Sequence, residues 1–129
     1  MDPWSNRRFD HLEQSEIQLM NQVQMQDIGF KDYQEAWDYQ NQLFQKIVDN
    51  KLANRDRERH QSSHNFFLFT EHYPVYTLGK SGDISNLLLN KEELEQKGIY
   101  FFKSNRGGDI TFHGTGQIVG YPIMDLELF

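Results

Sequence analysis

The segment Arg106-Gly-Gly-Asp-Ile-Thr-Phe-His-Gly-Thr-Gly-Gln-Ile-Val-Gly-Tyr121 contains five of the chain's nine glycines within sixteen residues. Glycines at this density permit backbone conformations that other residues avoid, and they let a ligand approach bare main chain. The polar side chains of Arg106 and His113 accompany these glycines, and short β-type stretches flank them. We therefore expect a ligand-contacting loop between strands, with the preceding residues acting as scaffold.

Outward from this loop, short apolar stretches predict further strands. Val23 and Met25 alternate with glutamines, which is typical of a half-buried strand, and Gly29 is expected to end it. The continuous apolar run of residues 66–70 suits a strand that is buried on both faces. Three more strands are expected at Ile99–Phe102, Ile110–Phe112 and Ile118–Met124.

A long helix is predicted from about Tyr33 to about Asn50. Asp32 lies three residues before Glu35, which is the spacing of a capping box. Apolar residues then follow at helical spacing; they are Tyr33, Ala36, Trp37, Phe44, Ile47 and Val48. The polar residues 51–65 either continue the helix end or form a surface loop.

A second, shorter helix is expected to begin after Asn90. Glu93 follows three residues later, and Gly98 is the expected stop. Two helices and five or six strands in mixed order indicate a single α/β or α+β domain. After the last strand the sequence shows no further element at 125–129, so we expect the sheet there to expose an edge or to lack neighbours.

Composition argues against several classes of function, such as nucleic-acid binding and membrane spanning. The chain has 129 residues, a net charge of −6 and no cysteine. An acidic chain is unsuited to nucleic acid, which needs a basic face, and no stretch approaches the roughly 20 apolar residues of a membrane span. Disulfides and a cysteine nucleophile are excluded within these residues. We expect a cytoplasmic protein with a polar N-terminal extension at residues 1–21.

Two common nucleotide-binding patterns do not fit. Gly114 and Gly116 have the first spacing of a dinucleotide fingerprint, but the next glycine is Gly120 and a strand follows. The triplet Gly79-Lys80-Ser81 lacks the earlier glycine of a phosphate-binding loop. A plain glycine-rich hairpin, whose glycines only satisfy turn geometry, is the alternative to a ligand loop.

Other polar groups give weaker signals. His60, His64 and His72 have no acidic ligand at a diagnostic spacing, so we interpret them as solvated surface histidines and expect no metal site. Asp83 and Asp109 could be imagined as a carboxylate pair, but nothing in the sequence fixes their distance. We expect both to be solvated loop residues.

The segment 106–122 resembles the hallmark segment of lipoyl(octanoyl) transferases, which are lipoate-biosynthesis enzymes related in fold to biotin protein ligases and lipoate ligases. The family pattern reads Arg-Gly-Gly, then Thr-Tyr-His-Gly-Pro-Gly-Gln, then Tyr-Pro; this chain has Phe112 and Thr115 at two of these positions. Residues 32–37 and 70–79 match as well, and the resemblance spans about 23–128. The run His113-Gly-Thr-Gly-Gln117 is transferase-like, since lipoate ligases tend to have an acidic residue after the histidine.

The resemblance implies a biotin/lipoate ligase-like mixed sheet with flanking helices, of which residues 22–129 form the N-terminal part. It implies transfer of an octanoyl group from octanoyl-acyl carrier protein to a lysine of a lipoyl domain, in 2-oxoacid dehydrogenases or glycine cleavage H protein, without a cofactor. The substrate-binding residues it implies are Arg106, Gly107, Gly108, Asp109, Ile110, Thr111, Phe112 and His113.

The physical chemistry of an octanoyl thioester fits these residues. Its apolar tail requires an apolar slot, which Phe101, Phe112 and Val119 could help to form. Its carbonyl head requires donors, which glycine amides together with Thr111 or His113 could supply. Arg106 would anchor the loop or contact the polar head.

The nucleophile of this family is a cysteine whose pKa a lysine lowers, and both lie in the C-terminal half of the domain, beyond Phe129. We therefore expect this chain to hold the acyl-binding part and to be inactive alone, as a truncated product, one piece of a split protein or an incomplete record. Two alternatives remain: an ATP-dependent lipoate or biotin ligase relative, and a non-catalytic binding remnant.

Overall fold

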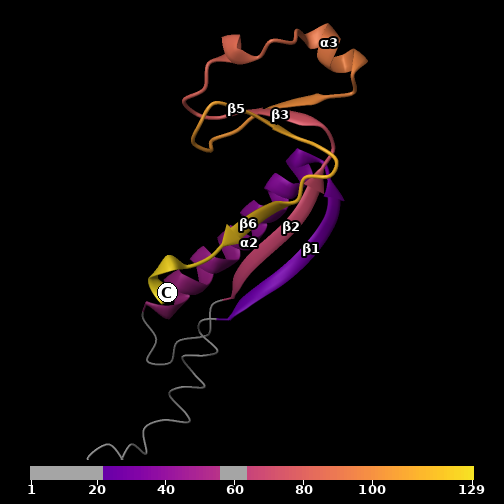
Figure 1. Ribbon diagram of the computed structural model, residues 1–129. Helices are drawn as coiled ribbons and strands as arrows, with labels where there is room; N and C mark the ends of the chain where they lie inside the picture. The colour runs from indigo at the N-terminus through magenta and orange to yellow at the C-terminus, as the bar shows by residue number, and fades with distance from the viewer. Residues whose placement is uncertain (1–21, 56–63) are drawn as a thin grey trace, which may run out of the picture.

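The computed structural model describes residues 22–55 and 64–129, which form two three-stranded sheets and a long helix (Figure 1). The expected extension at 1–21 and the histidine at position 60 lie outside the described residues. The predicted α+β fold class is confirmed: helices and strands alternate in mixed order, and both sheets contain parallel and antiparallel pairs.

The first sheet, here called the helix-backed sheet, has the order β1-β2-β6. Its strands are β1 (Val23–Lys31), β2 (Asn65–His72) and β6 (Val119–Ile123), with β1 parallel and β6 antiparallel to β2. A parallel pair needs a crossover connection, and α2 (Tyr33–Asn54) supplies it by packing on one face of the sheet (Figure 1). In the described part of the chain β6 lies at one edge of this sheet, but a short helical turn at Leu126–Leu128 follows it, where the sequence suggests no further element.

The apolar core lies between α2 and the helix-backed sheet. Leu43 and Ile47 of α2 pack against Phe66, Leu68 and Ile123 of the sheet, and all five are at most 8% exposed. The alternation of a strand brings residues two apart to one face, which explains why 66 and 68 face the helix together. Burial of each such side chain stabilises the fold by about 1.5–3 kcal/mol.

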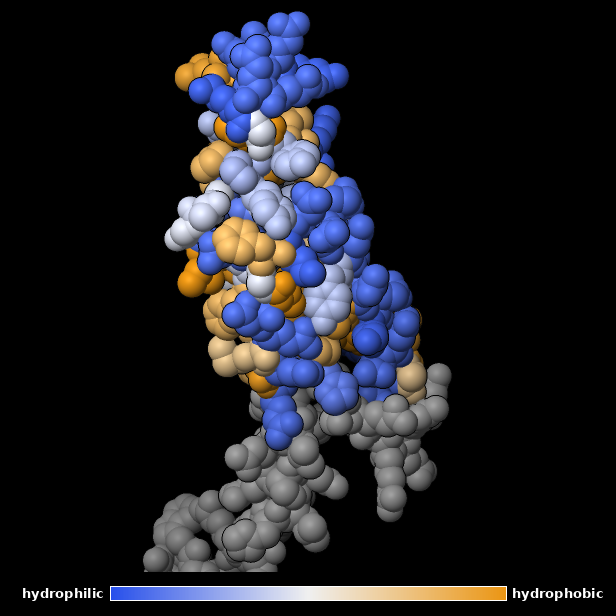
Figure 2. All heavy atoms as spheres, turned by 90° about the vertical axis from the view of Figure 1, so that its right-hand side faces the viewer, coloured by the Kyte–Doolittle hydropathy of each residue, from blue (hydrophilic) through white to orange (hydrophobic). Residues whose placement is uncertain are grey.

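The outer face of the same sheet is only half covered, so the expectation of a strand buried on both faces is confirmed for one face alone. Phe67 and Phe69 are half-buried there, with ring centroids 4.9 Å apart. Gly120 lies opposite them, where a Cβ would come within 2.9 Å of the Phe67 ring. On the face shown in Figure 2, hydrophobic residues lie among hydrophilic ones toward the left, and hydrophilic residues dominate the top and the right-hand edge.

Two details of β1 differ from the sequence prediction. Gly29 does not end the strand: it sits in a bulge between Asp27 and Phe30 with φ of +68°, and its N–H donates to the Asp27 carboxylate at 2.9 Å. A bulge accommodates one extra residue without ending the pairing. Met25 is 67% exposed rather than half-buried, because it lies on the outer face that α2 does not cover.

The start, the end and one packing position of α2 also need correction. Asp32 is the N-cap residue, but its side chain makes no capping hydrogen bond, so the predicted capping box is absent. The helix continues to Asn54, which means that the first residues of the polar stretch belong to it. Phe44 is 59% exposed, and the preceding Leu43 faces the core instead.

The second sheet, here called the loop-bearing sheet, has the order β4-β3-β5. Strand β3 (Val75–Leu78) is central, β4 (Tyr100–Lys103) is parallel to it and β5 (Ile110–His113) is antiparallel. Two short helices, η1 (Ile84–Asn86) and α3 (Lys91–Gln96), connect β3 to β4, and η2 (Leu126–Leu128) follows β6. Strands β4, β5 and β6 begin and end within one residue of the predicted bounds.

The short helix α3 has the capping box that the sequence predicts. Asn90 accepts a hydrogen bond from the Glu93 N–H at 2.9 Å, and the Glu93 carboxylate accepts from the Asn90 N–H at 2.7 Å. Gly98 follows the helix with φ of +64°, a conformation that glycine adopts without strain. The predicted start and stop of this helix are therefore both confirmed.

Candidate functional site

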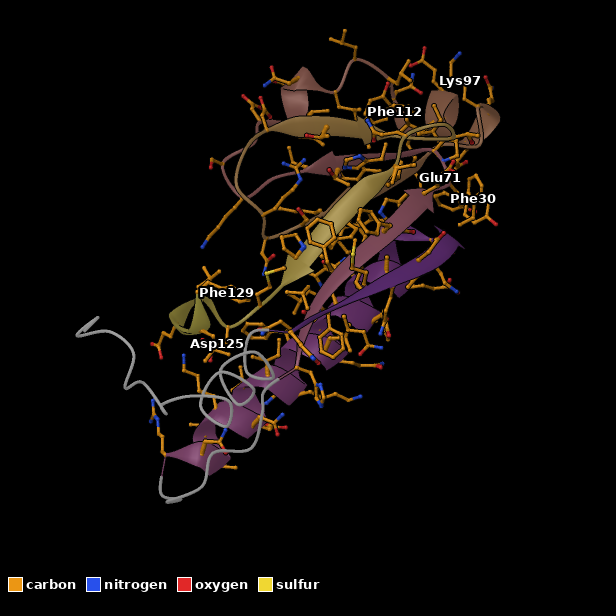
Figure 3. The ribbon with its side chains drawn as sticks, turned by 60° about the horizontal axis from the view of Figure 1, so that its bottom comes forward. Phe30, Glu71, Lys97, Phe112, Asp125 and Phe129 are labelled. Carbon is orange, nitrogen blue, oxygen red and sulfur yellow. The ribbon has the colours of Figure 1, made fainter. Side chains whose placement is uncertain are left out.

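The glycine-rich segment lies where the two sheets meet. Strand β2 leads into β3 through Tyr73 and Pro74, and β5 leads into β6 through residues 114–118, so two connections join the sheets. Figure 3 shows Glu71 at the end of β2, close below the sheet that holds Phe112. The junction therefore collects residues from both sheets and from the start of α2.

Arg106 fixes the glycine loop to the central strand of the loop-bearing sheet. Its Nη2 donates to the Thr77 carbonyl at 2.8 Å and to the Thr77 hydroxyl at 2.6 Å, and its Nη1 donates to the Gly107 carbonyl at 2.7 Å. Thr77 is fully buried. Because hydrogen bonds to a charged donor are among the stronger ones, this side chain acts as an anchor of the loop, one of the two roles expected for it.

Two backbone segments approach very closely beside this anchor. The Gly79 N–H donates to the Asp109 carbonyl at 3.0 Å, and a Cβ on Gly79 would lie 2.1 Å from the Gly108 carbonyl oxygen. Gly108 has φ of +88°, which favours glycine. In contrast, no atom lies within 4 Å of a Cβ built on Gly107. The loop geometry thus requires glycine at positions 79 and 108. At Gly107, no contact with the described residues requires glycine.

Asp109 is exposed, as expected, and it also organises the loop after β3 through hydrogen bonds. Its carboxylate accepts hydrogen bonds from the Asp83 N–H at 3.0 Å and from the Asn86 side-chain amide. The Asp83 carboxylate accepts from the Ser85 N–H at 2.9 Å, and the hydrogen bonds with Ser85 hold the pKa of Asp83 below its usual value. Both residues are exposed, so the expectation of solvated loop residues is confirmed, and the Asp109 carboxylate contacts the backbone of Asp83 rather than its carboxylate.

His72 is fully buried, which corrects its interpretation as a surface histidine. Its Nδ1 lies 3.0 Å from the Lys31 carbonyl oxygen and its Nε2 lies 2.7 Å from the Tyr121 hydroxyl. A carbonyl only accepts, so Nδ1 carries the proton and Nε2 accepts from the tyrosine. Burial lowers the pKa of His72, which favours the neutral ring.

The sequence did contain a signal for His72 that our interpretation missed. Phe66, Leu68 and Thr70 alternate along the predicted strand, and position 72 continues that series two residues later. A residue in this series faces the covered side of the sheet. Extending the strand by two residues would have predicted a buried histidine.

His113 lies beside His72 in a cluster of rings. The His113 ring stacks on Tyr33 with centroids 6.4 Å apart and planes at 10°, and it lies 5.8 Å from the His72 ring. Its Nδ1 lies 2.5 Å from the Gln117 side-chain oxygen. Burial raises the pKa of the Tyr33 hydroxyl, and the positive charge of Arg106 opposes this shift. Sequence reasoning identified His113 but not Tyr33 or Gln117.

The expected apolar slot is not formed by the three residues proposed for it. Phe101 and Phe112 pair with Tyr76 from its two sides, so they share one face of the loop-bearing sheet, and they are 39% and 44% exposed. Val119 belongs to the helix-backed sheet. Thr111 and His113 alternate with Phe112 and therefore lie on the opposite face.

A cavity of about 680 Å3 lies beside Phe101, but residues 106–113 do not line it. Its walls come from the η1–α3 region and β4, and they are mainly apolar; they include Leu87, Leu89, Leu94 and Ile99. The face of the sheet that bears His113 and the face toward this cavity are thus separate environments.

Residues 22–55 and 64–129 contain neither a metal-binding cluster nor a membrane-spanning helix. No group of three or more histidine, aspartate or glutamate side chains is arranged there to hold a metal ion. In the same part of the chain, no helix is both long and apolar enough to cross a membrane.

Comparison with known proteins places these features in a family. The model of the Lipoyl protein ligase A/B catalytic domain matches residues 32–128. An octanoyltransferase of Flavobacterium psychrophilum is 64% identical over 107 residues, which are 83% of this chain and 46% of the relative. Octanoyltransferases of Flavobacterium johnsoniae and Cytophaga hutchinsonii are 60% and 50% identical, over 86% and 83% of this chain and 48% and 45% of theirs.

The chain therefore spans about half the length of the curated relatives that it matches. The region matched by the family model begins at residue 32, just after β1, and includes α2, β2, β6, the loop-bearing sheet and the whole glycine-rich segment. The family model matches most of the chain, and the relatives are 50–64% identical to it, which settles its membership. The chain belongs to the family of the Lipoyl protein ligase A/B catalytic domain.

Proposed function

We propose that this chain supplies the acyl-binding part of an octanoyltransferase that modifies lipoyl domains. The donor would be octanoyl-acyl carrier protein, and the acceptor would be a lysine of a lipoyl domain in a 2-oxoacid dehydrogenase or in glycine cleavage H protein. The observation that carries the proposal is the glycine loop of residues 106–108, fixed by Arg106 while Gly107 stays open. Relatives that are named octanoyltransferase support octanoyl as the acyl group that is transferred.

The loop has the properties that a thioester head group requires. The main chain at Gly107 and Gly108 is exposed, so an acyl carbonyl can approach without meeting a side chain. Arg106 holds this main chain in place through Thr77, which limits the reorganisation needed when substrate arrives. His113 would orient the thioester or the incoming amine from the neighbouring ring cluster.

Asp109, Ile110, Thr111 and Phe112 complete the proposed substrate-binding stretch in different ways. Asp109 shapes the loop through its bonds to the segment after β3. Thr111 lies on the same sheet face as His113 and could contact the head group, whereas Ile110 and Phe112 lie on the other face. We infer that these two act by holding β5 in register.

The first experiment supplies the other half of the domain. The C-terminal half of the Flavobacterium psychrophilum relative, expressed separately, is mixed with this chain, octanoyl-acyl carrier protein and a lipoyl domain. We expect the lipoyl domain to gain the mass of one octanoyl group only when both halves are present. No gain above either half alone would reject the proposal that this chain contributes the acyl site.

The second experiment blocks the loop without disturbing the fold. Gly107→Val places a branched side chain where no atom lies within 4 Å of the Cβ, so the folded state should persist. We expect at least a tenfold loss of transfer in the mixed assay, because the added methyl groups occupy the space of the acyl head. Gln45→Ala, on the exposed face of α2, is the matched control and should keep full transfer.

Two other functions give different outcomes in these assays. An ATP-dependent ligase relative would form an acyl-adenylate, so ATP would raise the melting temperature of the protein. A binding remnant would capture acyl carrier protein or a lipoyl domain without turnover, even when the C-terminal half is supplied. The cytoplasmic location of the reaction remains a prediction from the sequence.

A further inference from the structure

The short turn after β5 brings Gln117 against His113. The Gln117 N–H donates to the Gly114 carbonyl at 3.2 Å and closes the turn, and Gly116 allows it with φ of +86°. The Gly116 N–H donates to the Glu71 carboxylate at 3.1 Å, which ties the turn to β2. Two hydrogen bonds therefore fix the turn: one closes it, and the other ties it to the helix-backed sheet.

The contact between the two side chains defines which nitrogen of His113 bears the proton. The Gln117 Oε1 lies 2.5 Å from the His113 Nδ1. An amide oxygen only accepts, so Nδ1 must donate, and in the neutral ring Nε2 then presents a lone pair. The Nε2 atom makes no hydrogen bond to any residue of 22–55 or 64–129.

The other contacts of the ring leave this lone pair usable. Tyr33 stacks on one face of the His113 ring, with planes at 10°, and the neutral His72 lies to one side at 5.8 Å. Neither group competes for a hydrogen bond in the ring plane: His72 is already occupied by Lys31 and Tyr121. The ring is thus held by a stack and by one hydrogen bond.

We propose that Gln117 is a positioning residue that holds His113 as the Nδ1–H tautomer, so that Nε2 accepts a hydrogen bond from the attacking amine of the acceptor lysine. The proposal rests on the proposed octanoyl transfer for the identity of the amine. The tautomer itself does not depend on that function, so the two can fail separately. Free histidine in water favours the Nε2–H tautomer, so the hydrogen bond that His113 Nδ1–H donates to the Gln117 Oε1 must reverse an intrinsic preference.

The test is a long-range 15N–1H correlation spectrum of the labelled 129-residue chain, recorded at a pH where the imidazole is neutral. We expect His113 to show the Nδ1–H pattern in the native protein. Gln117→Met keeps the length of the side chain but removes the acceptor, and we expect the ratio of Nδ1–H to Nε2–H tautomer to fall at least fivefold. Gln117→Glu restores an acceptor at the same place and should restore the native pattern.

Two internal references separate the effect from a general disturbance. His72, whose Nδ1 proton bonds to the Lys31 carbonyl, should keep the Nδ1–H pattern in every variant. Gln45→Ala removes another hydrogen bond between side chains four residues apart, Gln45 to Asp49, and should leave His113 unchanged. A native His113 in the Nε2–H form, or an unchanged tautomer in Gln117→Met, would overturn the proposal.

The role in the reaction is measured in the mixed assay with the C-terminal half. We expect Gln117→Met to lower kcat about tenfold with little change in KM for octanoyl-acyl carrier protein, and Gln117→Glu to recover most of the rate. Unchanged kcat alongside a changed tautomer would refute the assigned role toward the amine. Absence of transfer with the native chain would instead reject the proposed function and leave the tautomer result standing.

Discussion

The two sheets of this molecule are stabilised in different ways. The helix-backed sheet buries a continuous apolar cluster against α2, centred on Leu68. In the loop-bearing sheet, β3 buries Val75, Thr77 and Leu78, but Phe101 of β4 and Phe112 of β5 stay exposed. Its loops are held instead by the Arg106 guanidinium and by close backbone contacts.

This difference suggests that apolar burial stabilises the helix-backed sheet, whereas directed hydrogen bonds and close backbone contacts fix the loops of the other sheet. Apolar burial is not directional and tolerates small shifts, whereas a hydrogen-bonded loop against a glycine works in one arrangement only. A site that must bind a polar head group benefits from the second kind of stabilisation, because bare amides stay accessible. Substitutions that act on one kind of stabilisation and not the other can test this contrast.

The largest effect is expected at the centre of the apolar cluster. Leu68 is fully buried between α2 and its neighbouring strands, so Leu68→Ala should lower the free energy of unfolding by about 2–5 kcal/mol. Met25→Ala, at a residue that is 67% exposed on the outer face, should change it by less than about 0.5 kcal/mol. Urea denaturation measures both, and equal losses would contradict the assignment of the core to the helix side.

The next effect separates two glycines that the sequence presents as equivalent. Gly79→Ala would place its Cβ 2.1 Å from the Gly108 carbonyl oxygen, so the two loops must move apart at a cost of about 1–3 kcal/mol. Gly107→Ala meets no atom within 4 Å and should cost less than about 0.5 kcal/mol. Thermal unfolding of the two variants measures the difference. A similar loss from both would show that the loop contact does not contribute to stability.

The sequence predicted most of the helix-backed sheet because its signals are local. The apolar spacing of α2 and the run at 66–70 depend only on neighbouring residues, and both elements were found. The errors came from tertiary structure. Leu43 rather than Phe44 faces the core because the sheet fixes the rotation of the helix, and Gly29 lies in a bulge because β2 continues to pair with β1 beyond it.

The candidate site was only partly predictable for a similar reason. The glycine-rich motif identified Arg106 and His113, since their spacing in the segment is visible in the chain itself. Tyr33 and His72 come from elements 80 and 41 residues earlier than His113, and only the fold brings them beside it. No local pattern marks the bond between Thr77 and Arg106, which joins residues 29 apart.

The buried histidine at the junction should make stability depend on pH. Burial lowers the pKa of His72 below its ordinary value of 6.5, so the unfolded chain takes up a proton before the folded one does. This contribution is complete above about pH 6.5 and is lost as the pH falls toward the folded pKa. The slope is at most about 1.4 kcal/mol per pH unit for one proton.

Denaturation of the native chain and of His72→Gln between about pH 5 and 8 measures this slope. We expect the variant to be less stable at pH 8 but to lose less stability on acidification, because glutamine does not titrate. His64→Gln, at an exposed position, should keep the native slope. A native slope in His72→Gln would mean that other groups cause the acid sensitivity.

The smallest effect compares the N-termini of α2 and α3, which belong to the helix-backed part and the loop-bearing part respectively. Asn90 accepts the Glu93 N–H in a complete capping box, whereas the side chain of Asp32 makes no capping bond at α2. Asn90→Ala should therefore cost about 1 kcal/mol locally, and exchange of the Glu93 amide hydrogen should accelerate roughly fivefold. Asp32→Ala removes only the attraction of a carboxylate to the helix dipole, a few tenths of a kcal/mol, and exchange at the start of α2 should change less than twofold.

If Asp32→Ala had the larger effect, capping would contribute more to the stability of the helix-backed part than its buried cluster suggests. The contrast between burial in one sheet and directed hydrogen bonds in the other would then need revision at α2.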